Sequence, residues 1–348
     1  MLVSVSTLKD RPDQALLFVR RNLHNGIDHM FVFLDAAQPE VAEVLRAEPH
    51  VTVIEAHGES WWGDKRPSQL NLRQHTNANV LKAVISGLEG VTWMFHLDAD
   101  EVIHLDRPRL EGLDRSVSIV HLETLEVATG EWVPGAPALY KRGLNNNQLA
   151  LLHTLGVILE PVNTVYFHGH TGGKSGFRPT LALYTGIHKP RDERDEVPEG
   201  HTADWLRVLH HEGAGFHAFE RKWRNLLTSG PRPKFRRTRN QTASAFLAIL
   251  NAGFPPEKEE HYLREIYRRR AEDDTELLND LGLLVSVNPD ERRYEPRGIP
   301  PAALATVERR LAGAAEQDKL IYRTGPTKAV NRLLAQLESG RSRFRLRP

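Results

Sequence analysis

No cysteine occurs among the 348 residues of the sequence. A disulfide framework, a thiolate nucleophile and a cysteine-ligated metal site are therefore excluded, and a reducing compartment is the simplest expectation. Any metal ion must be held by His, Asp or Glu side chains. The sequence also lacks a strong charge of one sign, because 46 Lys and Arg residues oppose 45 Asp and Glu residues.

Long apolar runs are missing too. No stretch approaches the roughly 20 apolar residues that a membrane-spanning helix needs. The first residues, MLVSVSTLKDRPDQ, lack the basic and apolar regions of a secretory signal. We therefore expect a cytoplasmic protein whose contact with a membrane is at most peripheral, at its inner face. Hydrophobic residues make up 40% of the chain, which is enough for a large core in one large or two modest domains.

The first half of the sequence alternates short β-rich runs with amphipathic segments. Apolar residues at helical spacing follow Pro12 and Pro39, and the strongest helical pattern covers residues 71–88. Strands are predicted at 2–6, 30–35, 51–56 and 91–98. This order is typical of an α/β fold with a largely parallel sheet, whose strands end at one ligand-binding edge.

The composition changes after Pro190, where a charged connection containing Pro and Gly begins. Helical periodicity dominates beyond it, and helices are predicted at about 204–228, 241–252, 257–272, 300–314 and 327–338. We therefore predict an α/β domain of catalytic type over residues 1–190. A helical region over residues 191–348 is expected to pack on it.

Asp98 and Asp100 follow the predicted strand 91–98. Two carboxylates at the end of a buried strand are costly unless a cation or hydrogen bonds compensate them. Mg²⁺ is usually held by one or two carboxylates together with substrate phosphates, and Mn²⁺ suits the same ligands. In an extended segment both side chains point to one side and can share an ion. The same acids can instead cap the next turn, and the tripeptide alone leaves both interpretations open.

Four motifs occur in order around this pair: STLKD, then GIDHMFVFLD, then the segment Asn79–Ile103 with DADE, and GKS…RP…GIHK between Gly173 and Lys189. Together they resemble the family-2-like glycosyltransferases of the GT-A fold. The resemblance implies a Rossmann-like, mostly parallel sheet with flanking helices, followed by a helical C-terminal region. It also implies metal-dependent transfer of a sugar, with inversion, from a nucleoside diphosphate sugar to a hydroxyl acceptor.

By this resemblance, Asp98, Asp100 and His188 hold the metal ion, Mn²⁺ or Mg²⁺, and Asp98 also contacts the diphosphate. A neutral imidazole is a ligand for such ions, whereas outside the family context His188 is the polar end of a strand. Lys174 and Arg178 can face diphosphate oxygens. Exposed Lys and Arg are otherwise usually solvated.

Thr7, Lys9 and Asp35 match positions that surround the nucleoside in related enzymes. The pair Lys9-Asp10 stands where Asn-Glu is frequent in the family, so the base is not fixed by the motif. Uridine is expected from the resemblance alone. Asp10 is at least as well explained as a helix N-cap.

A catalytic base must accept the proton of the acceptor hydroxyl. His211 and Glu212 are the first candidates, because they lie in LHHEGAGFHAFERKW, the part of the C-terminal region that matches best. Glu131 and Asp204 remain alternatives, and each of the four could be an ordinary surface or capping residue. A saccharide is the expected acceptor by analogy. Trp61-Trp62 could stack on a sugar or base, or anchor a loop to the core.

The stretch 221–239 holds eight Lys or Arg residues and no acid. It indicates a phosphate-rich partner, either a nucleotide diphosphate or an anionic membrane. Nucleic acid is not expected, since no nucleic-acid-binding motif accompanies the stretch.

Two alternatives to the glycosyltransferase remain. One is a non-catalytic nucleotide- or polyanion-binding module. The other, weaker one is a metal-dependent phosphohydrolase. The repeated histidines HGH at 168–170 and HH at 210–211 suggest zinc, but no His-Glu-x-x-His motif accompanies them.

Overall fold

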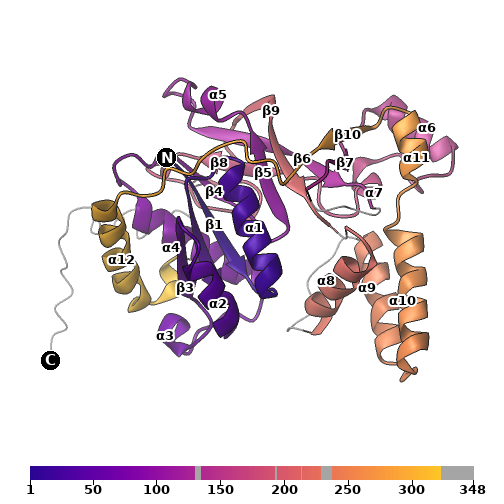
Figure 1. The fold of residues 1–348 in the computed structure, drawn as a ribbon, viewed down its shortest axis with the longest axis horizontal. Helices are drawn as coiled ribbons and strands as arrows, with labels where there is room; N and C mark the ends of the chain where they lie inside the picture. Colours follow the sequence, from indigo (N-terminus) through magenta and orange to yellow (C-terminus); the bar gives the residue numbers. More distant parts are fainter. Residues whose placement is uncertain (130–134, 193, 213, 229–236, 323–348) are drawn as a thin grey trace. The chain divides into compact units, whose positions relative to one another are not determined.

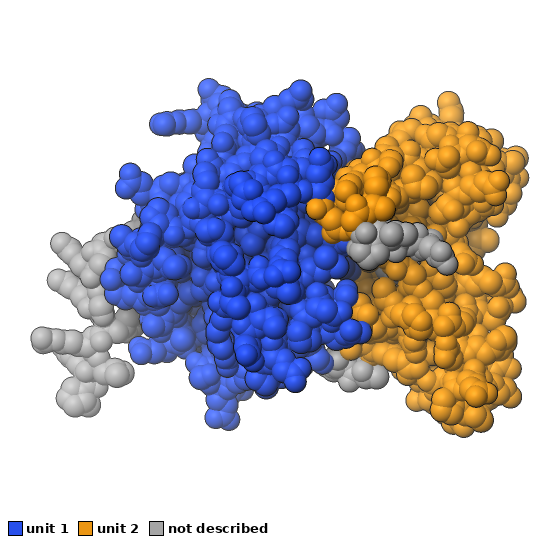
Figure 2. Space-filling model, in the orientation of Figure 1, with its two compact units in different colours: residues 1–123, 172–208, 291–348 blue, residues 124–171, 209–290 orange. Residues whose placement is uncertain are grey.

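The computed structural model describes residues 1–129, 135–192, 194–212, 214–228 and 237–322. The chain divides into two compact units, coloured blue and orange in Figure 2. Unit 1 comprises Met1–Glu123, Gly172–Val208 and Glu291–Pro348, and unit 2 comprises Thr124–Thr171 and Leu209–Asp290. The units therefore do not follow a single division at residue 190. The functions predicted for residues 1–190 and 191–348 stay predictions.

Unit 1 is built on a mixed sheet whose core strands are parallel (Figure 1). The parallel strands lie in the order β3-β2-β1-β4, and Val5 of β1 lies opposite both Phe31 of β2 and His96 of β4. Their bounds are β1 Leu2–Leu8, β2 His29–Leu34, β3 Val51–Glu55 and β4 Trp93–His96. The predicted α/β fold with flanking helices is confirmed.

Beyond β4 the sheet of unit 1 continues with antiparallel strands. β8 (Lys174–Phe177) pairs with β4, and the first part of β6 (Ile119–Val127) pairs with β8. The pairing of β8 with β4 brings the chain back into unit 1 after residue 171. The sequence motif around Lys174 is thereby placed beside the strand that leads to Asp98.

Helices cover both faces of this sheet. Alternate residues of each strand point to opposite faces, so the strands contribute apolar side chains to both. Leu2, Val32 and Phe95 pack with α1 (Pro12–His24) and α2 (Pro39–Arg46) on one face. The other face, which includes Val5 and Phe33, packs against helices α3, α4 and α12. Their bounds are α3 Glu59–Trp62, α4 Leu70–Ile85 and α12 Pro301–Ala315. The short helix η1 (Lys319–Tyr322) follows α12.

The helix predicted from residue 204 is wrong in its first part. Residues His201–His210 form strand β9, which pairs with β5 (Glu101–Leu105), and the helix α8 begins only at Phe216 and ends at Thr228. Leu206 and Val208 are fully buried at alternate positions of β9. This spacing of two is the strand period, and pairing with β5 selects it over the helical spacing. The short helix α5 (Arg107–Glu111) follows β5.

Unit 2 contains the end of β6, which pairs with β7 (Ala138–Lys141), and β7 pairs with β10 (Leu284–Val287). Its remaining helices are α6 Asn146–Thr154, α7 Asn163–Tyr166, α9 Arg237–Leu250, α10 Pro256–Arg270 and α11 Thr275–Asp280. Phe219, Trp223 and Phe246 join α8 to α9 in an apolar cluster. The helix predicted at 327–338 lies outside the described residues. None of the helices in the described part of the chain is both long and apolar enough to cross a membrane.

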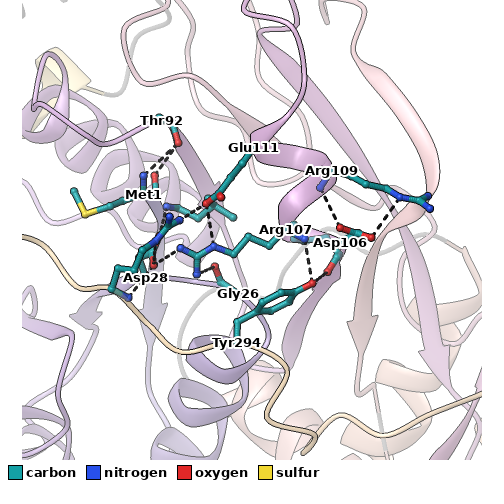
Figure 3. Close-up of polar contacts among 12 residues, drawn as sticks. Met1, Gly26, Asp28, Thr92, Asp106, Arg107, Arg109, Glu111 and Tyr294 are labelled. Atoms are coloured by element: carbon teal, nitrogen blue, oxygen red, sulfur yellow. Dashed lines mark hydrogen bonds and ion pairs between the residues drawn. The ribbon is translucent and has the colours of Figure 1, made fainter.

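The segment after residue 290 returns to unit 1 as an irregular strap, residues 291–299. Asp28, which is fully buried, receives hydrogen bonds from the backbone N–H groups of Leu2 and Arg297, at 2.8 and 2.9 Å. The same carboxylate accepts from Nη2 of Arg107 at 2.6 Å, a contact drawn in Figure 3. One carboxylate therefore holds the first strand, the helix after β5 and the strap together.

We expect Asp28→Ala to lower the free energy of unfolding by about 3–5 kcal/mol, because it removes the fully buried carboxylate that pairs with Arg107 and leaves only the more exposed Glu111. Urea denaturation measures the loss. Arg11→Ala is the control, since it removes an ion pair with Asp13 whose side chains are 65% and 52% exposed, and it is expected to cost less than about 1 kcal/mol. Equal effects of the two substitutions would contradict this role of Asp28.

Candidate functional site

Three of the predicted site residues lie at the carboxyl edge of the parallel strands. Thr7 is near the end of β1, Asp35 directly follows β2, and Asp98 follows β4. Backbone hydrogen bonds continue the strand pairing past the strand ends, from Asp35 N to Leu8 O at 2.8 Å and from Leu97 N to Val5 O at 3.0 Å. This edge is where open α/β sheets bind ligands.

The Asp-x-Asp segment is a turn and not an extended strand. The backbone N–H of Glu101 donates to the carbonyl oxygen of Asp98 at 3.0 Å, and β5 begins at Glu101. The side chain of Glu101 reaches back to accept from the backbone N–H of Asp98 at 2.8 Å. The expectation that strand alternation aligns Asp98 with Asp100 is therefore wrong, because the chain turns from β4 into β5 at these residues.

A buried lysine completes this turn. Nζ of Lys174 lies 2.7 Å from Oδ2 of Asp98, 3.0 Å from Oε2 of Glu101 and 3.1 Å from the carbonyl oxygen of Ile187. Lys174 and Glu101 are fully buried, whereas the side chain of Asp98 is 21% exposed. Burial alone would lower the pKa of Lys174, but attraction to the two carboxylates outweighs it and raises that pKa. The lysine stays charged.

Burial would likewise raise the pKa of Asp98, but the Lys174 ammonium outweighs it and holds that pKa below its usual range. The other oxygen of Asp98, Oδ1, accepts a hydrogen bond from Nε2 of Gln74 at 2.8 Å. Asp98 is therefore ionised and fixed in orientation from two sides.

Helix α4 positions this edge with polar side chains that sequence reasoning missed. Arg73 donates to both oxygens of Asp35 at 2.6 Å, and Asn77 donates to Oγ1 of Thr7 at 3.0 Å. Gln74 likewise donates a hydrogen bond to Asp98. All three helix residues are buried. The sequence signal for these residues is the polar run RQHTNAN. It lies within a predicted helix whose apolar residues already form the face that packs on the core.

Asp35 is thus held by guanidinium groups, since Nη2 of Arg66 also lies 3.2 Å from its Oδ1. Thr7 is buried beside it, and Lys9 is exposed just past the end of β1. The predicted contacts of Thr7, Lys9 and Asp35 with a nucleoside stay predictions.

His188 lies on the loop that follows β8. Its Nδ1 is 3.2 Å from the carbonyl oxygen of Gly173. Because a carbonyl oxygen only accepts, the proton is assigned to Nδ1, and Nε2 has the lone pair that a metal ion needs.

Gly173 has φ +60°, and a Cβ there would lie 2.1 Å from the carbonyl oxygen of Leu122. The glycine before Lys174 is therefore required by a close backbone approach.

Two further histidines lie near this loop. His96 is buried with Nδ1 3.3 Å from the carbonyl oxygen of Ile187, and burial together with Lys174 lowers its pKa to about 4. His75 of α4 has Nδ1 2.9 Å from the hydroxyl of Tyr184. Burial and the nearby Arg191 lower the pKa of His75 as well. Both rings are neutral at pH 7.

Arg178 is not brought to the carboxyl edge. Because β8 runs antiparallel to β4, Lys174 lies near Asp98 while Arg178 lies at the opposite end of the pair. Its guanidinium stacks 4.6 Å from the ring of Trp93, the first residue of β4, and its Nε donates to the carbonyl oxygen of Val117 at 3.0 Å. We therefore leave Arg178 out of the proposed site.

The candidate bases His211 and Glu212 belong to unit 2. Nε2 of His211 lies 3.0 Å from the hydroxyl of Tyr140. Glu212 is buried and is contacted by Nζ of Lys222 at 2.5 Å and Nη1 of Arg239 at 3.2 Å.

A second buried lysine lies in unit 2. Nζ of Lys141 is 3.1 Å from Oε1 of Glu126, 3.0 Å from Oδ1 of Asp273 and 3.1 Å from the carbonyl oxygen of Tyr166. Nε2 of His168 lies 3.0 Å from the same oxygen of Asp273. The sequence showed His168 only as part of a histidine repeat and gave no sign of its partner.

The basic stretch 221–239 is partly described. Lys222 and Arg239 contact Glu212, and Nη2 of Arg224 lies 2.5 Å from Glu259. These three cations therefore pair with acidic residues of the same chain, and residues 229–236 lie outside the described part.

Trp61 and Trp62 are buried, and their indole N–H groups donate to Asn77 and to the carbonyl oxygen of Ala56. They anchor their loop to the core.

No protein-family model matches the chain, and no curated protein matches it in sequence. Among solved structures, core-mannan synthase A (CmsA/Ktr4) from Aspergillus fumigatus, in its Mn/GDP form, aligns at 11% identity with a TM-score of 0.21, over 35% of this chain and 41% of that chain. A mannose-1-phosphate geranyltransferase from Thermus thermophilus aligns at 11% identity with a TM-score of 0.25, over 78% of this chain and 70% of that chain. Both are distant structural similarities, and we draw no functional conclusion from them.

We expect Lys174→Met to destabilise unit 1 by about 3–5 kcal/mol, because Asp98 and Glu101 lose the cation that they share. Chemical denaturation measures this loss. Lys65→Met, which removes a half-exposed pair with Asp318, is the control. A variant as stable as this control would contradict the role of Lys174.

The ion pairs of Lys141 predict a pH dependence. Burial would raise the pKa of Glu126 and Asp273, but Lys141 outweighs it and lowers both. Their contribution to stability is therefore present above the pKa of the unfolded chain, about 4, and is lost as the pH falls below it. Lys141→Met should cost about 3–5 kcal/mol at pH 7 and distinctly less at pH 3, measured by urea unfolding. An equal cost at both pH values would contradict the assignment.

Proposed function

We propose that the protein is a metal-dependent glycosyltransferase, which binds a nucleoside diphosphate sugar at the carboxyl edge of its parallel strands. The observation that carries the proposal is the fixed, ionised and partly exposed Asp98 at this edge, held by Lys174 and Gln74. Asp100 follows it in the same turn. The motif resemblance in the sequence supplies the reaction class.

The charge of the turn fits a divalent cation. Asp98, Asp100 and Glu101 carry three negative charges, and Lys174 supplies one positive charge. Two negative charges remain, which is the charge that Mn²⁺ or Mg²⁺ neutralises. We assign Asp98, Asp100 and the Nε2 atom of His188 as its ligands. The ion, when bound, offsets the charge that develops on the leaving diphosphate.

Lys174 has a positioning role in this proposal. Its ammonium points at two carboxylates and a backbone carbonyl, so it keeps Asp98 ionised and oriented. Thr7, Lys9 and Asp35 are assigned to the nucleoside, with Arg73 holding Asp35 in place. Uridine is the base that we propose.

The acceptor is proposed to be a saccharide hydroxyl. A base has to take its proton while the sugar is transferred with inversion, and His211 and Glu212 are the residues that we assign to this step. Imidazole Nε2 of His211 lies beside the Tyr140 hydroxyl, which can orient the ring. The carboxylate of Glu212 contacts Lys222 and Arg239.

A thermal-shift screen of nucleoside diphosphates and their sugar esters, with and without Mn²⁺, tests the donor site. One nucleotide at about 100 times its dissociation constant should stabilise the protein by about 2.7 kcal/mol, and only when the metal is present. Asp100→Asn should abolish this shift. Asp64→Asn, at an exposed position of unit 1, should leave it intact.

A shift that needs no metal and survives Asp100→Asn would favour the nucleotide-binding module. A response to polyanions alone, lost at high salt, would favour the polyanion-binding module. Product analysis separates the phosphohydrolase, because water and not a saccharide is then the second substrate.

A further inference from the structure

Unit 1 contains a cavity of about 280 Å³ at the end of β5. Its polar and aromatic lining comes from three segments that are far apart in the sequence: β5 with the turn after it, β9, and the strap at 291–299. The lining side chains are His104, Asp106, Arg109, Asp204, Trp205 and Arg293. None of them belongs to the donor site proposed above.

Hydrogen bonds fix the three segments to one another. The backbone N–H of Asp106 donates to the carbonyl oxygen of Trp205 at 3.3 Å, which joins β5 to β9. The hydroxyl of Tyr294 donates to the carbonyl oxygen of Leu105 at 3.4 Å and accepts from the backbone N–H of Arg107 at 3.2 Å. Figure 3 shows Tyr294 bridging this turn. The cavity therefore has a preformed wall on each side.

The lining is balanced in charge and rich in both donors and acceptors. Arg109 and Arg293 carry positive charge, and Asp106 and Asp204 carry negative charge. Burial, together with the guanidinium groups of Arg293 and Arg207, lowers the pKa of His104 to about 4, so this ring is neutral at pH 7. Nη1 of Arg293 lies 3.2 Å from Nδ1 of His104. A strong anion or cation gains little from such a set.

A neutral, hydroxyl-rich ligand can gain from several of these groups. Its hydroxyl groups can donate to the carboxylate of Asp204 and accept from the guanidinium of Arg109, whose Nε lies 3.4 Å from Oδ2 of Asp106. The half-buried indole of Trp205 offers an apolar face to the C–H side of a sugar ring. The volume lies just below the range of ligand pockets, which is about 300 to 1,000 Å³, so it suits one small ring.

We propose that this cavity is a saccharide subsite that binds one neutral sugar ring of an acceptor chain. Its place along β5 sets its relation to the donor site. Glu101 begins β5 beside Lys174 and Leu105 ends it beside the cavity, a separation of about 13 Å. The subsite therefore holds a ring away from the reacting hydroxyl. Only its role in the transfer reaction rests on the proposed function; the binding does not.

Saturation-transfer NMR with neutral trisaccharides of glucose, mannose, galactose and N-acetylglucosamine tests the binding, with the full chain and without nucleotide or metal. At least one trisaccharide should bind, with an affinity that is unchanged between low and high salt. Asp204→Asn and Arg109→Ala should each weaken it about tenfold, since each removes a charge-assisted hydrogen bond. Both side chains are exposed, so the fold should tolerate the changes.

Asp64→Asn and Arg194→Ala change the same residue types at other exposed positions of unit 1 and should leave the affinity within about twofold, as expected for sites away from the ligand. The proposal is overturned if no trisaccharide binds, if the Asp204 and Arg109 variants bind like these controls, or if binding requires a carboxylate or sulfate on the sugar. Saccharide binding without a metal-dependent nucleotide shift would sustain the subsite and remove the glycosyltransferase. The reverse result would remove the subsite alone.

Discussion

One arrangement recurs at two fully buried places of the described chain: a lysine ammonium bound to two carboxylates and one backbone carbonyl. Lys174 contacts Asp98, Glu101 and the carbonyl oxygen of Ile187 in unit 1. Lys141 contacts Glu126, Asp273 and the carbonyl oxygen of Tyr166 in unit 2. An ammonium has three hydrogens, and each of these lysines uses all three. A charge can stay buried only when its hydrogen bonds are satisfied in this way.

The arrangement in unit 1 also decides what the edge of the sheet can bind. A fully buried ammonium between two acids neutralises only one of them, so the turn at 98–101 keeps an excess of negative charge. Asp98 is the member of the pair that is partly exposed, at 21%, whereas Glu101 has no exposed surface. The excess charge is therefore presented to solvent at Asp98. In the proposed function, a cation attracted there would lie near the carboxyl end of β4, which neighbours β1.

The parts of the fold that depend on local sequence were predictable, whereas contacts between distant strands were not. Strands β1 to β4 and helices α1, α2 and α4 occur within a few residues of their predicted bounds, because each carries its own hydrophobic period. The sequence pattern predicts a helix where strand β9 lies, because pairing with the distant β5 decides the period of two.

The motif residues show the same limit. Lys174 is 76 positions from Asp98, and the motif assigns Lys174 and Arg178 to one diphosphate. Antiparallel pairing of β8 with β4 instead places these two cations at opposite ends of a strand, so strand direction decides which motif residues meet.

The strap at 291–299 shows how an irregular segment can be as well fixed as a strand. The backbone N–H groups of Arg293 and Tyr294 donate to the carbonyl oxygen of His24, and those of Arg297 and Gly298 donate to the side chain and carbonyl oxygen of Asp28. Asp28 is itself held by Arg107. Because these bonds are made within the folded chain, ordering of the strap does not have to accompany ligand binding. A ligand in the cavity at the end of β5 therefore meets an Arg293 that is already in place, and this preorganisation lowers the entropic cost of binding.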